Sequence, residues 1–190
     1  MASFYETSDF RNGLKVEIDG NPFTMVYFQF VKPGKGTAFT RTKLKNLLSG
    51  AVIERTFRTG ETLPAADIEE AVMNYLYNDG ENYVFMNNAS GEQVEIPTGS
   101  LGDEAGFLMD NLECSIMFWR GKPVNVTLPT FIESKVVSTE PAVRGNTSGN
   151  AMKTAVLECG ASVLVPLFVS EGDMLKVDTR EGGSYVSRVK

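Results

Sequence analysis

The sequence has no histidine, and this absence narrows the chemistry that its 190 residues can perform. Histidine is the usual general base near neutral pH, the usual activator of a serine or cysteine nucleophile, and the commonest transition-metal ligand. Only two cysteines occur, Cys114 and Cys159, far apart and without a CxxC or metal-ligand spacing. We therefore expect buried or unreactive thiols, no metal site, no cofactor and no hydrolase-type catalysis.

Long apolar runs are also missing. No stretch approaches the roughly eighteen apolar residues that can span a bilayer, and no basic segment followed by an apolar run stands near the start. Hydrophobic residues make up 42% of the sequence and charged residues 22%, which is typical of a folded domain rather than a disordered chain. We expect a cytoplasmic monomer with no membrane association.

The net charge of −6 is distributed unevenly along the chain. Residues 1–63 hold nine Lys/Arg against six Asp/Glu, residues 64–129 hold two against eleven, and residues 130–190 hold seven against seven. Because RNA repels a strongly acidic surface, we expect the middle segment to face protein or solvent and to set the distance between the other two.

The first segment contains a basic stretch. No Asp or Glu lies between Asp19 and Glu54, whereas five cations do: Lys32, Lys35, Arg41, Lys43 and Lys45. Screening over a Debye length of about 8 Å separates such a face from a distant acidic domain, so binding to nucleic acid is compatible with a net negative charge. A solvated basic face without a partner is the alternative.

The chain has the pattern of β-structure from end to end. Residues 14–18 alternate, 19–22 form a turn, and 23–31 are rich in aromatic and β-branched residues, which predicts a hairpin. Over 37–44 the alternation places Arg41 and Lys43 on one face. With a further strand over 51–57, the first segment is predicted to be a small, strongly bent barrel.

Strands are also predicted for most of the other two segments, over 75–77, 83–86, 114–119, 124–128, 131–137, 155–157, 162–168, 174–179 and 184–189. One helix is predicted over 100–113, since acidic residues stand near its start and apolar residues follow at close to helical spacing. An acid-Gly-x-x-Tyr-Val pattern occurs at 79–84 and at 181–186, which suggests that the two segments are versions of one barrel.

The loop between residues 30 and 39 is the best clue to function. Pro33 fixes one φ angle, and Gly34 and Gly36 permit positive φ on either side of Lys35. A long cation therefore stands alone at the tip of a tight turn. Taken by itself, such a loop is typical of an ordinary solvent-exposed turn.

Residues along the whole chain match one family pattern: 8–15 (SDFRNGLK), 30–36 (FVKPGKG), 75–80 (YLYNDG), 165–169 (VPLFV), 176–180 (KVDTR) and 185–189 (YVSRV). The sequence resembles bacterial elongation factor P. The match covers all three segments in order, and the PGKG loop together with the carboxy-terminal pattern is highly specific.

The resemblance implies an all-β fold of three small β-barrels in an L shape: an SH3-like (KOW-type) domain over 1–63 and OB-type domains over 64–129 and 130–190. It implies a translation factor that is not an enzyme. The expected partners are the 70S ribosome, rRNA and peptidyl-tRNA, bound between the peptidyl and exit tRNA sites, where the family relieves stalling at consecutive prolines.

The resemblance also assigns the site. Lys35 is expected to carry β-lysylation, with hydroxylation, added by lysine-modifying enzymes, and the loop residues Lys32, Pro33, Gly34 and Gly36 are expected to lie near tRNA. Phosphate contacts are expected from Arg41, Lys43 and Lys45.

Two regions of the third segment complete the expected site. Tyr185 and Arg188 match tRNA-contacting positions, although three residues apart in a strand they face opposite sides unless a bulge intervenes. The loop of Gly145, Asn146, Thr147, Ser148 and Gly149 corresponds to the one that approaches the exit-site codon. Asn146 stands where the family usually has aspartate, and the residues that follow depart from its glycine-rich run.

Two other functions are open. A β-barrel RNA-binding or ribosome-assembly module would share the basic face without acting on peptide bond formation. An enzyme using Lys35 as a Schiff-base nucleophile would need a desolvated pocket to lower the lysine pKa, and no residue pattern supplies one.

Overall fold

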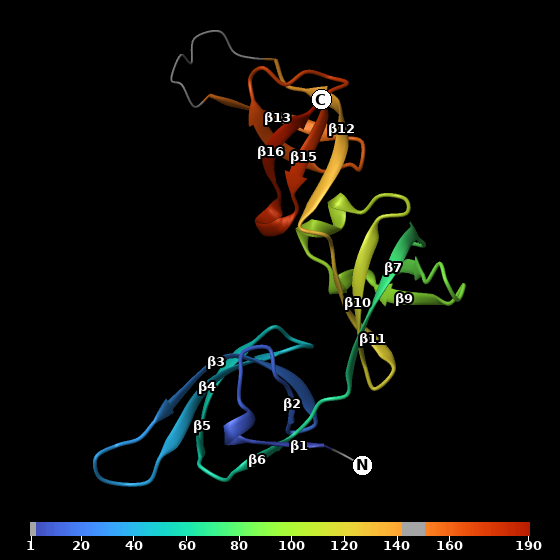
Figure 1. Ribbon diagram of the computed structural model, residues 1–190. Coiled ribbons are helices and arrows are strands. Elements are labelled where there is room, and N and C mark those ends of the chain that lie inside the picture. Colours follow the sequence, from blue (N-terminus) through green and yellow to red (C-terminus); the bar gives the residue numbers. More distant parts are fainter. Residues whose placement is uncertain (1–2, 142–150) are drawn as a thin grey trace. The chain divides into compact units, whose positions relative to one another are not determined.

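The computed structural model describes residues 3–141 and 151–190, and in that part of the chain every regular element is a β-strand or a short 3₁₀ helix (Figure 1). The chain divides into two compact units, Met1–Glu70 with Met117–Asn125, and Ala71–Ile116 with Val126–Lys190. No helix among the described residues is long and apolar enough to cross a membrane.

The first unit is built on an antiparallel four-stranded sheet in the order β2 (Lys15–Ile18), β3 (Asn21–Val31), β4 (Phe39–Asn46), β5 (Val52–Arg58). A short sheet of β1 (Phe4–Glu6) and β6 (Thr62–Pro64) accompanies it, with a 3₁₀ turn over Thr7–Asp9. The core cluster is Phe10, Leu14, Val16, Ile18, Phe23, Met25, Leu44, Phe57 and Leu63. This core anchors the base of the β3–β4 hairpin, whose far end carries the loop of Lys35.

Two five-stranded sheets form the second unit. One has the order β11 (Lys122–Thr127), β10 (Glu113–Trp119), β7 (Ile68–Asn78), β8 (Asn82–Met86), β9 (Gln93–Pro97). The other has the order β14 (Ser162–Pro166), β13 (Met152–Leu157), β12 (Phe131–Thr139), β15 (Met174–Asp178), β16 (Ser184–Val189). The tip of the β10–β11 hairpin belongs to the first unit.

The two five-stranded sheets have the same topology. When the strands of each sheet are numbered one to five along the chain, both sheets have the spatial order 5-4-1-2-3. The repeated acid-Gly-x-x-Tyr-Val pattern does not mark equivalent places, because 79–84 joins strands one and two while 181–186 joins strands four and five. The sequence repeat therefore pointed to a shared topology through positions that do not correspond.

The prediction of a helix over 100–113 is wrong, because the structure has no α-helix there. Its first half is a 3₁₀ turn over Asp103–Phe107, and Leu108 is extended, at φ −65° and ψ 128°. Glycine at positions 99, 102 and 106 disfavours an α-helix, and Asn111 at φ 64° ends any continuation. The backbone of 111–112 instead pairs with Tyr75, through N–H to carbonyl distances of 2.9 Å in both directions. Tertiary pairing with β7 thus replaces the local helix.

Both cysteines are free thiols. Cys114 is buried, and desolvation raises the pKa of its thiol to about 12, so the thiolate is absent at neutral pH. Cys159 is partly exposed. Cys114 therefore acts as a small apolar core residue.

Within the second unit, the 3₁₀ turn over Asp103–Phe107 packs against the turn before β16. Phe107 is only 1% exposed, and a Cβ placed on Gly183 would lie 2.2 Å from its Cζ atom. Gly183 also has φ 92° and ψ 138°, a conformation that residues with a side chain rarely adopt. Glycine is therefore required at position 183 for two independent reasons.

We expect Gly183→Ala to lower the free energy of unfolding by at least about 2 kcal/mol, since it adds steric overlap to backbone strain. Gly182→Ala is the matched control, because Gly182 has φ 81° but a Cβ placed on it would have no atom within 4 Å. Gly182→Ala should lower the free energy of unfolding by only about 1 kcal/mol, which is the cost of the backbone strain alone. Chemical denaturation measures both, and equal losses would contradict the packing role of Phe107.

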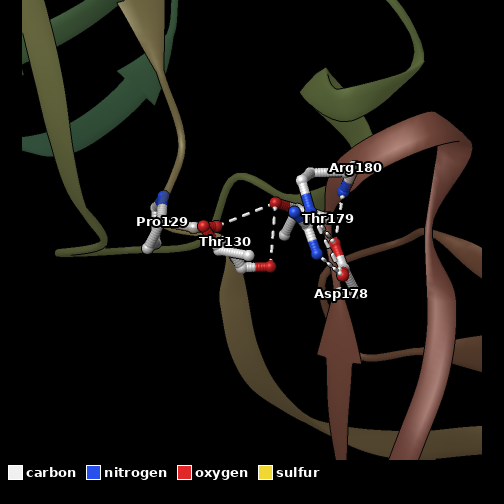
Figure 2. A network of polar contacts seen from close by, with 5 residues as sticks. All are labelled: Pro129, Thr130, Asp178, Thr179 and Arg180. Atoms are coloured by element: carbon white, nitrogen blue, oxygen red, sulfur yellow. Dashed lines mark hydrogen bonds and ion pairs between the residues drawn. The ribbon is translucent and has the colours of Figure 1, made fainter.

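A network of hydrogen bonds joins the residues just before β12 to the residues at the end of β15 (Figure 2). Thr179 donates its hydroxyl to the Pro129 carbonyl at 2.8 Å, with the Thr130 carbonyl at 3.3 Å. Beside it, the Asp178 carboxylate accepts from the backbone N–H, Nε and Nη2 of Arg180. These side-chain and backbone hydrogen bonds lower the pKa of Asp178 to about 2.

The lowered pKa of Asp178 predicts a contribution to stability that depends on acid. A carboxyl with a lowered folded-state pKa stabilises fully above its unfolded pKa of about 3.9, and the contribution is lost as the pH falls toward 2. Asp178→Asn should therefore lower the thermal midpoint at pH 7 more than at pH 2.5. A difference between the two proteins that is independent of pH would exclude this linkage.

Candidate nucleic-acid interface

The loop of Lys35 joins β3 to β4 at the far end of their hairpin (Figure 1). Of its two glycines, only Gly36 adopts positive φ, at 107°, and a Cβ there would meet Pro33 Cγ at 3.9 Å. Gly34 has no positive φ, and a Cβ placed on it would have no atom within 4 Å. Pro33 and Gly36 therefore constrain the turn, whereas neither the backbone conformation nor the packing requires glycine at position 34.

Lys35 itself is exposed, and Lys32 is exposed beside it. Among the described residues, Lys35 has no side-chain hydrogen-bond or ion-pair partner. A lysine without a partner keeps its rotamer freedom and leaves its ammonium accessible. The loop thus presents a cation at the end of a defined backbone.

The outer face of β4 carries the predicted cations. Arg41, Lys43 and Lys45 are exposed, while the alternate residues Thr40, Thr42 and Leu44 are buried. The Thr42 hydroxyl donates to the Arg55 carbonyl at 2.7 Å, which satisfies this buried polar group. The structure therefore places the three cations on one face, while their contact with RNA stays a prediction.

Aromatic side chains lie among these cations. The Arg41 guanidinium lies 5.5 Å from the ring centroid of Phe39, and Lys43 Nζ lies 5.9 Å from that of Tyr27. Tyr27 pairs with Lys43 across the strands and donates its hydroxyl to Gln29 Oε1 at 3.1 Å. Phe28 and Phe30 of the same strand are also exposed, but they pair with the buried Thr42 and Thr40 and therefore lie on the opposite face from the cations. Cations beside exposed rings are well suited to contact both phosphates and bases.

No acidic residue lies between Asp19 and Glu54 in the sequence, but in the fold Glu54 lies beside one of the cations of this basic stretch. Glu54 on β5 pairs with Lys43 on β4, and its Oε1 lies 3.6 Å from Lys43 Nζ. A hollow of about 390 Å³ opens on this face, lined by Tyr27, Gln29, Arg41, Lys43, Glu54 and Thr56 among others. The acid lowers the local positive potential and holds one of its cations.

The second unit brings Tyr185 and Arg188 together. The pairing of β15 with β16 shifts register between Lys176–Ser187 and Val177–Tyr185, so that Val186 is an extra residue in β16. This is the bulge that the spacing of Tyr185 and Arg188 required. Both contact Phe168, at 6.5 Å between ring centroids for Tyr185 and 5.4 Å from guanidinium to ring centroid for Arg188.

Sequence reasoning missed three aromatic members of these clusters, Tyr27, Phe39 and Phe168. Their signal is weak, because Tyr27 and Phe39 stand among other aromatic and apolar residues and Phe168 lies inside the apolar run 163–169. The predicted codon-loop residues 145–149 lie outside the described part of the chain. Within the described part, no three His, Cys, Asp or Glu residues are grouped so that they could hold a metal ion.

Three family models match the chain in order. They are the elongation factor P (EF-P) KOW-like domain over residues 6–63, the EF-P OB domain over 68–126, and the elongation factor P C-terminal domain over 132–188. The matches cover most of the chain. They confirm the all-β fold with one SH3-like and two OB-type domains that the sequence predicted.

Solved structures support the same fold. Eukaryotic translation initiation factor 5A from Methanococcus jannaschii aligns with a TM-score of 0.56 at 23% identity, over 67% of this chain and 93% of that one. A translation initiation factor eif-5a family protein from Naegleria fowleri aligns with a TM-score of 0.52 at 17% identity, over 67% of this chain and 99% of that one. With matches to all three of its domain models, the chain belongs to the elongation factor P family of non-enzymatic translation factors.

Proposed function

We propose that this translation factor binds the ribosome between the peptidyl and exit tRNA sites and relieves stalling at consecutive prolines by positioning peptidyl-tRNA. The observation that carries the proposal is the exposed Lys35, which has no side-chain partner among the described residues, at the tip of a hairpin whose outer face bears Arg41 and Lys43. That arrangement suits an element that enters a narrow RNA-lined site with its cation first.

The chemistry of proline explains why positioning is useful. Proline is a constrained secondary amine whose ring fixes φ, so a peptidyl-prolyl end and an incoming prolyl-tRNA are poorly placed for attack. The ribosome supplies the catalytic environment. A factor that holds the acceptor end in place reduces the entropic part of the barrier, and each ~1.4 kcal/mol gained raises the rate about tenfold.

In this proposal Lys35 approaches the acceptor end of peptidyl-tRNA and is extended by β-lysylation, which adds length and amine donors. Lysine-modifying enzymes are therefore partners as well as the 70S ribosome, rRNA and tRNA. Arg41, Lys43 and Lys45 contact phosphates, and Tyr185 and Arg188 contact tRNA from the last domain. The protein acts in the cytoplasm as a monomer.

The proposed function uses three domains at residues 1–63, 64–129 and 130–190. The segments matched by the family models, 6–63, 68–126 and 132–188, support this division. The acidic middle domain faces ribosomal protein or solvent, because its eleven acids against two cations would be repelled by RNA. The loop of 145–149 approaches the exit-site codon.

Lys35 should be decisive for activity but not for folding. Since its side chain is exposed, we expect Lys35→Ala to keep the thermal midpoint and to slow synthesis through a run of prolines by at least about tenfold. Lys122→Ala, which removes another exposed lysine, is the control. A reporter with and without a proline run measures the effect. Full relief of stalling by Lys35→Ala would favour an RNA-binding module without a role in peptidyl transfer.

The native protein should carry added mass on Lys35. Peptide mass spectrometry of protein from its own host locates the addition, with the peptides of Lys32 and Lys122 as internal comparisons. An unmodified Lys35 in fully active protein would contradict the modification.

Alanine substitutions at the two glycines of the loop, Gly34 and Gly36, should affect activity to different extents. Gly36→Ala strains a backbone at φ 107°, at a cost of about 1 kcal/mol or more, whereas Gly34→Ala meets no atom and needs no positive φ. We expect Gly36→Ala to reduce relief of proline stalling clearly more than Gly34→Ala does. Equal activities of the two variants would show that the loop geometry is not used.

The basic face should bind RNA through charge. Replacing Arg41, Lys43 and Lys45 together by alanine should flatten the dependence of ribosome affinity on salt by about two to three counterions. Glu54→Gln should act in the opposite direction and raise affinity about twofold at low salt, because it releases Lys43. Glu95→Gln is the control for total charge. An unchanged salt dependence in the triple variant would exclude these phosphate contacts.

A further inference from the structure

An exposed aromatic ring lies between the two predicted tRNA-contacting residues of the last sheet. Phe168, just after β14, is 59% exposed, whereas Val165 before it and Val169 after it are fully buried. The ring of Tyr185 meets it nearly edge-on, at 75° between planes, and the Arg188 guanidinium lies over it. Three side chains, two from β16 and one from the turn after β14, therefore form one surface cluster.

Asp173 restrains one member of the cluster, Arg188. Asp173 Oδ2 lies 3.6 Å from Arg188 Nη1, and the same carboxylate oxygen accepts the backbone N–H of Ser170 at 2.9 Å. Asp173 thus connects the guanidinium to the turn that follows Phe168. Because half of the Arg188 side chain remains exposed, the cation is oriented without being removed from solvent. An oriented cluster loses less conformational entropy when a ligand binds.

The composition of this cluster favours one ligand chemistry. Asp173 offsets part of the charge of Arg188, so attraction to phosphate alone would be weak. An exposed phenyl ring beside a guanidinium and a phenol offers what an unpaired base needs, namely a surface to stack on and polar donors at its edge. Bases within a duplex are already stacked and present no free face to it.

We propose that Phe168, Tyr185 and Arg188 form a stacking platform for an unpaired RNA base, with Phe168 as the residue that stacks. The inference deepens the proposed function and rests on it, since it takes the ligand of this domain to be RNA. It adds Phe168 to the contact residues and specifies a base rather than a backbone phosphate as the group bound. Arg188 lies over one face of the Phe168 ring and Tyr185 meets the ring nearly edge-on, so the base would stack on the other face.

Removing the ring tests the platform directly. We expect Phe168→Leu in the full chain to weaken binding of a short single-stranded RNA about tenfold and to leave binding of the same sequence in a duplex unchanged. The salt dependence should stay the same, because no charge is lost. Leu164→Ala is the matched control, as Leu164 is 60% exposed on the neighbouring strand β14. Phe168→Trp should restore binding.

A spectroscopic probe places the base at this ring rather than elsewhere on the protein. Trp119 is the one tryptophan of the sequence, and its buried Nε1 has no hydrogen-bond partner in the described part of the chain, so Trp119→Phe removes no bond. In the double variant Trp119→Phe, Phe168→Trp, the single tryptophan lies in the platform. Saturating single-stranded RNA should quench its fluorescence, whereas the duplex should not.

Several results would overturn the proposal. One is an equal affinity of wild type and Phe168→Leu for single-stranded RNA. Another is that Phe168→Leu loses as much affinity for the duplex as for the single strand. The third is that single-stranded RNA does not quench the fluorescence of the platform tryptophan. Any of these with intact relief of proline stalling would reject the platform and leave the proposed function standing. Loss of relief in Lys35→Ala tests that function separately, because Lys35 and Phe168 belong to different domains.

Discussion

The register between β3 and β4 is the constraint on which the candidate interface depends. Met25 pairs with Leu44, and both are buried; the register then shifts at Val26, so that Tyr27 pairs with Lys43. Without the extra residue, Tyr27 would oppose Thr42, which points inward. Because strand side chains alternate with a period of two, a shift of one residue transfers the rest of the strand to the other face.

The same device operates in the last sheet, where Val186 is the extra residue of β16. There the shift brings Tyr185 and Arg188 to one side, against Phe168, although their spacing in a regular strand would separate them. In both domains a bulge therefore gathers aromatic and cationic groups on one face of a strand, which is the outward face in β3 and the face shared with the buried Leu175 and Val177 in the last sheet. Bulges bend and twist the strand that carries them, which also suits small, strongly curved sheets.

These shifts mark the limit of what the sequence could predict. Alternation and turn residues located most of the strands, although not β1, β6 or β9, and the outward set of β4 followed directly from its period of two. A bulge leaves no comparable signal, because it depends on which residue of the partner strand fits. The failure over 100–113 has the same origin, since backbone pairing of 111–112 with Tyr75 is a tertiary contact that local spacing does not encode. The pairing of Glu54 with Lys43 is equally invisible along the chain, eleven residues apart.

Two kinds of cation in the described candidate sites suit different tasks. Lys43 and Arg188 each lie within 3.6 Å of a carboxylate and close to an aromatic ring, so their orientation is largely set before any partner arrives. Exposed ion pairs of this kind add little stability, which makes orientation their more useful effect. Lys35 has no such restraint among the described residues, and its side chain would lose up to about 2 kcal/mol of conformational entropy on being fixed. A modification that adds donors to Lys35 would supply new contacts to offset that cost, whereas the same addition to a paired lysine would first have to break its ion pair.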